Sequence, residues 1–238
     1  MMTRFMASEL AFNWRHNLSA ISGTVIIALC IFIVFAGPAL VAQNPYDVSQ
    51  LNLLDSYLPP VWMEGGNPNY LLGTDGQGRD VLAAVIYGTR ISALIGLAAT
   101  LLSCVIGTFL GLIAGYFGGW LDALIMRIAD IQLSFPSMLI ALFLMSAFGT
   151  GIDKILISLT AVGWVVYART VRGSTWGEGQ REYVQAARVA GLRDAAIIWR
   201  HILPNVMTPL IVVATVQVGT FILIEASLSF LGVGVPVT

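Results

Sequence analysis

The sequence predicts an all-α protein, a polytopic bundle of transmembrane helices. Hydrophobic residues make up 57% of its 238 residues and charged residues only 11%, whereas soluble domains carry about 25% charged residues. Four runs contain no Asp, Glu, Lys, Arg or His, namely 17–46, 91–121, 131–152 and 202–224. About 20 apolar residues are enough to cross a bilayer, so each run is long enough for a transmembrane helix.

We expect the first transmembrane helix at about 20–42. Its apolar core is far longer than the h-region of a signal peptide, which favours an uncleaved anchor. The rest of the N-terminal part, 1–90, is rich in turn-forming stretches such as NPYD, LPP and GGNPN. Within LLGTDGQGRDV, the pairs Asp75-Gly76 and Gln77-Gly78 favour tight turns with positive φ. Asp80 is expected to cap the helix that follows.

The second helix, at about 91–116, carries small residues at every fourth position. Its clearest row is Ser103, Gly107, Gly111 and Gly115. Small residues at this spacing let another helix approach closely, because their backbones are not shielded by side chains. We favour packing within one bundle; a surface that lines a permeation pathway is the alternative.

Three further helices are expected at about 131–149, 153–172 and 204–226. Pro136 removes a backbone donor, which predicts a kink or a helix start at that point. The run 155–168 is shorter than the others, but its basic flanks can reach the interface. Five transmembrane helices are therefore predicted in all.

The distribution of charge predicts the topology, because basic residues concentrate in cytoplasmic loops. Half of the twelve Lys and Arg residues lie in 169–201. The connections 43–90 and 150–154 instead hold more acidic than basic residues. This pattern places the N-terminus and the loop 173–203 in the cytoplasm and the segment 43–90 outside.

No motif for catalysis, nucleotide binding or metal ligation occurs. The only lysine, Lys154, is not part of a P-loop, and His16 and His201 form no H-E-x-x-H motif. Cys30 and Cys104 lie in apolar runs and are interpreted as small hydrophobic residues. We therefore expect no catalytic residue, metal site or cofactor in this protein, and nucleic acid is not an expected partner.

Glu225, near the outer end of the fifth helix, is the one acidic residue expected inside a span. Either it is an interfacial carboxylate capped by Ser227 and Ser229, or it faces a water-filled cavity. Ion-driven carriers usually need ionisable groups within the membrane, and the middles of the second to fourth predicted helices have none. The energy for any transport is therefore expected to come from a partner.

The loop 173–203 is among the most polar parts of the sequence. Its residues 182–190, EYVQAARVA, have high helix propensity, and Glu182 favours a helix start through the macrodipole. Gly191 is expected to stop that helix in the left-handed conformation. Asp194 is expected to cap a second helix, which leads into the last membrane run.

We expect this helix–turn–helix to lie on the cytoplasmic face, anchored by Tyr183 and Val184. Exposed alanines at Ala186, Ala187 and Ala190 would let the backbone of another protein come close. An ordinary amphipathic surface loop is the alternative.

This loop resembles the EAA loop of ATP-binding-cassette importer permeases, whose pattern is E-A-A, three residues, G, nine residues, then I-x-L-P. The positions that correspond to the pattern are Gln185, Ala186, Ala187, Gly191, His201, Leu203 and Pro204. Two of them depart from it: Gln185 replaces the Glu, and His201 stands where the pattern has Ile. The "RH-x-LPN" form is similar to that of the dipeptide and oligopeptide branch.

The stretches LLGTDGQGRDV, GLIAGYFGGWLDALIMRIADIQLSFPSM and EASLSFLGVGV are also similar to that branch, which includes nickel permeases, and to its "C" subunit type. The resemblance implies the type I importer permease fold, with 91–238 as the permease core. It also implies import of dipeptides or oligopeptides across the bacterial inner membrane. The implied partners are a second permease subunit, a periplasmic binding protein and two ATPase subunits that bind ATP and Mg²⁺ and dock on the loop.

Permeases of that branch generally have six helices, so the resemblance also implies that the sixth is missing and that the sequence is truncated at its C-terminal end. Two alternatives to a peptide-import subunit follow. One is a transport-incompetent or structural subunit, or a permease for nickel or another peptide-like substrate. The other is a self-sufficient channel or carrier.

Overall fold

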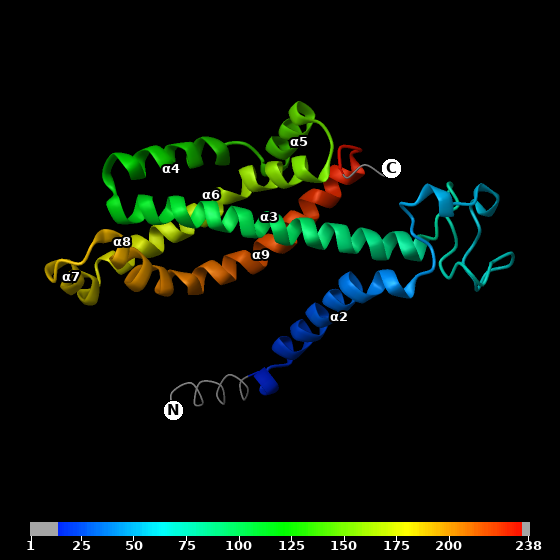
Figure 1. Ribbon diagram of the computed structural model, residues 1–238, viewed down its shortest axis with the longest axis horizontal. Helices are drawn as coiled ribbons and strands as arrows, with labels where there is room; N and C mark the ends of the chain where they lie inside the picture. The colour runs from blue at the N-terminus through cyan, green and yellow to red at the C-terminus, as the bar shows by residue number, and fades with distance from the viewer. Residues whose placement is uncertain (1–13, 235–238) are drawn as a thin grey trace. The chain divides into compact units, whose positions relative to one another are not determined.

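A computed structural model describes residues 14–234 (Figure 1). The described residues form helices and no β-strand, apart from an isolated bridge between Thr74 and Asp80, and this confirms the predicted all-α class. The chain divides into two compact units, one ending at Ile91 and the other beginning at Ser92. The predicted cytoplasmic N-terminus falls on residues 1–13, outside the described ranges.

The first unit contains α2 (Leu18–Leu40) and a loop-rich segment with two short 3₁₀ helices, Val48–Gln50 and Leu53–Asp55. Asn17 caps α2, because its Oδ1 accepts a hydrogen bond of 3.0 Å from the backbone N–H of Ser19. The helix matches the predicted first span closely, and most of its side chains are exposed.

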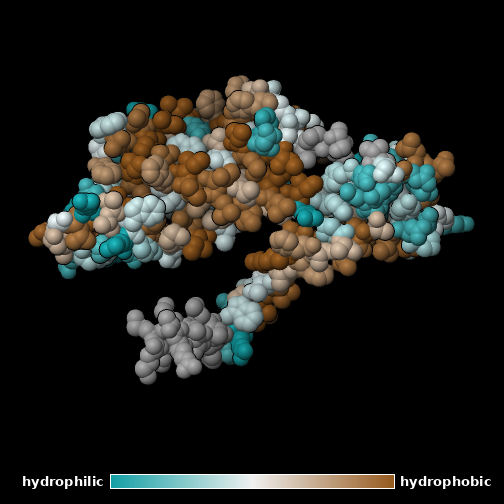
Figure 2. Space-filling model, viewed as in Figure 1, coloured by the Kyte–Doolittle hydropathy of each residue, from teal (hydrophilic) through white to brown (hydrophobic). Residues whose placement is uncertain are grey.

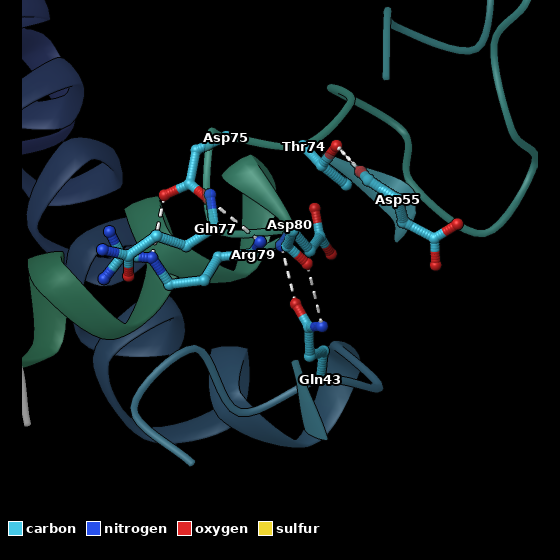
Figure 3. A network of polar contacts seen from close by, with 8 residues as sticks. Gln43, Asp55, Thr74, Asp75, Gln77, Arg79 and Asp80 are labelled. Carbon is cyan, nitrogen blue, oxygen red and sulfur yellow. Dashed lines mark hydrogen bonds and ion pairs between the residues drawn. The ribbon is translucent and has the colours of Figure 1, made fainter. Parts of the chain in front are cut away.

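The predicted cap of the next helix is confirmed. Oδ1 of Asp80 accepts from the backbone N–H of Leu82 at 2.9 Å, at the first turn of α3 (Val81–Phe117). The backbone N–H of Asp80 in turn donates to Oε1 of Gln43 at 2.6 Å (Figure 3). Gln43 thereby ties the end of α2 to the start of α3 within the first unit.

The turn before this cap is organised by Asp75 (Figure 3). Its Oδ1 accepts from the backbone N–H groups of Gln77 and Arg79, and its Oδ2 pairs with Nε of Arg79 at 2.8 Å. Burial alone would raise the pKa of Asp75, but these hydrogen bonds and the guanidinium together hold it below the usual value. Gly78 has positive φ as predicted, whereas Gly76 does not. Gly73 also has positive φ, which was not predicted.

The second unit contains the greater part of α3 and four other long helices. They are α4 (Gly119–Leu133), α5 (Ser137–Phe148), α6 (Ile152–Gly179) and α9 (Leu203–Phe230). Within the described residues, four helices are long and apolar enough to cross a membrane, and the bent pair of α4 and α5 makes up to five. Figure 2 shows hydrophobic side chains covering most of the visible surface of these helices.

The helix predicted at 131–149 is wrong in its bounds. Residues 119–133, expected mainly as a loop, form α4, and α5 begins only after a bend of 89°. Pro136 stands at the N-cap of α5; a proline lacks the N–H of a helix interior and disfavours helical geometry in the residue before it. The other spans are longer than expected, since α3 begins at Val81 and α6 continues to Gly179.

The predicted row of small residues on α3 lies against α6. The contacts join Ser103, Gly107, Gly111 and Gly115 of α3 to Thr160, Trp164, Ala168 and Arg172 of α6. Each pair is separated by 57 positions, as for Ser103 and Thr160, so the two helices run parallel in one constant register. A Cβ atom at Gly111 would lie 2.6 Å from the carbonyl oxygen of Ala168. This surface of α3 is therefore used in packing within the protein.

A second face of α3 packs against α9. A Cβ atom at Gly96 would lie 2.7 Å from the side chain of Ile222 and 3.3 Å from the carbonyl oxygen of Val218. At Gly163 of α6, a Cβ atom would meet both Ser103 and the ring of Phe221. The three long helices thus meet at positions where side chains are small.

We predict that Gly111→Ala destabilises the protein, whereas Gly219→Ala does not. Gly219 also lies in a helix, but nothing lies within 4 Å of its Cβ position. Overpacking at Gly111 should lower the free energy of unfolding by about 1–3 kcal/mol, and Gly219→Ala should gain up to about 1 kcal/mol of helix propensity. Thermal unfolding in detergent measures both. Equal midpoints for the two variants would contradict the tight α3–α6 contact.

Candidate coupling site

The polar loop contains a short helix, α7 (Glu182–Val189), that ends at a glycine as predicted. Gly191 has φ +76°; its N–H donates to the carbonyl of Arg188, and the N–H of Leu192 donates to that of Ala187. This pair of bonds is a Schellman motif, which satisfies the last carbonyl groups of the helix. Gly191 is therefore the residue that reverses the backbone direction after α7.

One face of α7 is packed into the protein. Val184 and Ala187 are buried in an apolar cluster with Ile197, Ile202 and Val206. The expectation that Ala187 is exposed is therefore wrong: only 5% of it is accessible, whereas Ala186 and Ala190 are exposed as expected. Eight residues make little more than two turns, so the apolar pattern did not fix which alanine faces inward.

The second helix of the loop differs from the prediction. It comprises α8 (Asp194–Ile197), with Arg193 rather than Asp194 at the N-cap, followed by a π-helical turn from Ile198 to Ile202. Pro204 occupies the first turn of α9 and donates no hydrogen bond to the preceding turn. The π-helical turn therefore lies where the series of backbone hydrogen bonds is interrupted at Pro204.

The aromatic ring of Tyr116, at the end of α3, contacts both parts of the loop. Its hydroxyl donates to Oδ1 of Asp194 at 2.6 Å. The guanidinium of Arg188 lies 5.0 Å from the centre of its ring, a cation–π contact. Asp194 thus serves as an acceptor for α3 instead of capping a helix.

Gln185, which replaces the Glu of the family pattern, holds α7 to the end of α6. Its Nε2 donates to the carbonyl oxygen of Gly179 at 2.9 Å. A carboxylate has no proton to donate in this contact. The departure from the pattern therefore has a structural use in this protein.

A second set of polar side chains links α6, α7 and α9. The hydroxyl of Tyr183 donates to Glu178 and accepts from Nδ2 of Asn205 at 3.0 Å. Burial and then the bond to Glu178 raise the pKa of Tyr183 above its usual value. Asn205 also donates to the carbonyl of His201 at 2.8 Å. His201 contributes a backbone acceptor at this place.

The remaining predicted loop residues lie around this cluster. Glu182 is at the start of α7 and is exposed, as is Pro204, while Leu203 is partly buried beside the apolar cluster. Val189 is 91% exposed although it is apolar, and the sequence analysis did not single it out. An aliphatic residue at the end of a polar helix is the pattern that would have indicated it.

Glu225 lies apart from the loop, in α9, and is buried. Its two oxygens accept from the hydroxyls of Ser92 on α3, at 2.5 Å, and of Ser229, at 2.7 Å. Ser227 instead donates to the carbonyl of Leu223. One of the two expected serines therefore contacts Glu225, and Ser92 was not expected.

We predict that Ala187→Asp prevents correct folding and that Ala186→Asp does not. The first change places a carboxylate in the apolar cluster, which should destabilise the fold by about 3 kcal/mol or more. The second places the same group on the exposed side of α7. The thermal unfolding midpoint of each purified variant is the measurement. A stable Ala187→Asp protein would show that this face of α7 is not packed.

Comparison with known proteins identifies the family. Residues 107–238 match the model of the binding-protein-dependent transport system inner membrane component. The chain is 40% identical to the dipeptide transport system permease protein DppC of Haemophilus influenzae, over 95% of its own length and 76% of that protein. It is 39% identical to the oligopeptide transport system permease protein OppC of Bacillus subtilis, over 94% and 70% of the two proteins. It is also 36% identical to the glutathione transport system permease protein GsiD of Pectobacterium atrosepticum, over 93% and 72%.

The family match covers more than half of the sequence, and the relatives are matched over more than two thirds of their length. Several apolar helices long enough to cross a membrane agree with a multi-pass membrane protein. The chain therefore belongs to the family of inner membrane components of binding-protein-dependent transport systems.

Proposed function

We propose that this protein is a permease subunit of an ATP-driven importer of dipeptides or oligopeptides, and that α7 is its coupling helix. The substrate class rests on the names of the relatives, which transport dipeptides, oligopeptides and glutathione. Separate ATPase subunits would bind ATP and Mg²⁺.

The observation that carries the coupling proposal is the division of α7 into two faces. Val184 and Ala187 anchor the helix, while Val189, Ala186 and Ala190 remain exposed at its other side. A short helix with small and aliphatic exposed residues suits a groove on another protein, because a backbone can approach it closely. The surface formed by Ala186, Val189 and Ala190 is called the docking face below.

The contacts of α7 would let it transmit a movement to the membrane helices. Gln185 joins it to the last residue of α6, Arg188 to Tyr116 at the end of α3, and Tyr183 to Asn205 of α9. Close-packed interiors transmit displacements because they deform little. A push on α7 would therefore reach three long helices together.

The other parts of the proposal follow from the family and from the charge pattern. A second permease subunit would complete the pathway, and a periplasmic binding protein would deliver the peptide. The excess of basic residues in 181–201 favours a cytoplasmic position for the docking face, together with the N-terminus. The membrane would be the bacterial inner membrane.

We predict that Val189→Asp releases the ATPase subunits from the complex. A charge buried without a partner in the proposed groove should weaken their binding at least about tenfold. The matched control is Leu54→Asp, because Leu54 is an aliphatic residue of the first unit with an exposure of 92%. ATPase subunits that copurify with the permease, and peptide-stimulated ATP hydrolysis, are measured for both variants. Unchanged copurification and hydrolysis in Val189→Asp would refute the docking face.

A further inference from the structure

One ion pair of the second unit lies at a depth where charged groups are costly. The helix α6 has 28 residues, and an upright helix needs about 20 residues to cross the hydrocarbon region. Every window of that length within Ile152–Gly179 includes residues 160–171, and Arg169 is among them. Arg169 therefore belongs to the membrane-spanning part of α6 wherever that part lies wholly within the helix.

The partner of Arg169 is Asp130 of α4. The depth of Asp130 in the membrane follows from the contacts of Gln132, two residues further along α4. Gln132 donates to the carbonyl of Val162 at 2.8 Å and accepts from the indole N–H of Trp164 at 3.0 Å. Both of these partners also lie in the central part of α6, so this end of α4 is held beside the middle of the membrane-spanning helix.

The ion pair is accessible in spite of this depth. The side chains of Arg169 and Asp130 are 48% and 54% exposed, respectively. Charged groups at membrane depth almost always face a protein interior or a water-filled cavity, because exposure to lipid is unfavourable. An arginine can extend toward the interface, but an aspartate is too short to do so, and its position follows that of α4.

The exposed surface of α4 is divided between two edges. One edge is apolar and consists of Trp120, Leu124, Ile128 and Ile131. The other carries Arg127 and Asp130, both exposed. At 100° per residue Arg127 lies about 20° from Trp120, at the border of the apolar edge, whereas Asp130 lies about 100° from Ile131. The side of α4 that carries Asp130 is therefore the side that does not suit contact with acyl chains.

We propose that the polar edge of α4, together with Arg169, lines the aqueous path of the imported peptide. The inference rests on the proposed function, and it adds the side of the bundle along which the substrate passes. Asp130 and Arg169 present opposite charges that match the ammonium and carboxylate groups of a zwitterionic peptide, and a guanidinium can bind a carboxylate in two-point fashion. The pair Asp122–Arg172, with contacts of 2.5 and 2.6 Å, holds α4 to α6 beside this site.

The test is the reaction of single cysteines with a charged, membrane-impermeant methanethiosulfonate in the complete transporter in liposomes. Cys30 and Cys104 are first replaced by alanine. Val166→Cys reports on the exposed face of α6 one turn from Arg169 and leaves the ion pair intact, and Asp130→Cys reports on the pair itself. The control is Ile131→Cys, next to Asp130 but on the apolar edge.

Positions 130 and 166 should react at least about tenfold faster than position 131, because thiolates do not form in hydrocarbon. A saturating dipeptide should slow both reactions. The proposal is overturned if 130 and 166 react as slowly as 131 with and without ATP, or if dipeptide leaves their rates unchanged. Dipeptide uptake by the cysteine-free transporter tests the proposed function separately, since the contrast between positions 130 and 131 is measured without added peptide.

Discussion

The close approach of α3 and α6 determines the arrangement of the second unit. At Gly111 and Gly115 the backbone of α3 lies so near α6 that a single added Cβ would be 2.6 Å from a carbonyl oxygen. Lipid provides no hydrophobic drive for this association, so it depends on contact between small residues. The register of this contact places Arg169 and Arg172 of α6 beside Asp130 and Asp122 of α4. It also brings Tyr116 to the polar loop that contains α7 and α8, where it contacts Asp194.

The polar loop that contains α7 and α8 combines firm attachment with an exposed surface. Its buried residues are shared with the long helices, since Val184 and Ala187 pack in the same cluster as Leu112 of α3 and Val171 of α6. Its exposed residues Ala186, Val189 and Ala190 form the proposed docking face. This arrangement would suit the proposed coupling to a separate ATPase subunit.

The parts of the fold predicted from sequence were those that local chemistry determines. The apolar runs indicated the spans, and Asp80, Pro136 and Gly191 marked helix ends through effects within a few residues. The errors arose where contacts between residues far apart in the sequence determine the structure. Asp122 and Asp130 made α4 look like a loop, because their partners on α6 are 50 and 39 positions away. The burial of Ala187 likewise depends on how the whole helix α7 rests on α6 and α9.

The π-helical turn between Ile198 and Ile202 has a consequence for the length of the loop. A π turn holds one residue more than an α turn within the same revolution, so the segments on either side keep the directions that an uninterrupted helix would give them. The direction in which α7 points therefore does not depend on the extra residue. Deletion of a single codon there would let the turn close as an α turn and would leave Ala186, Val189 and Ala190 facing the same way.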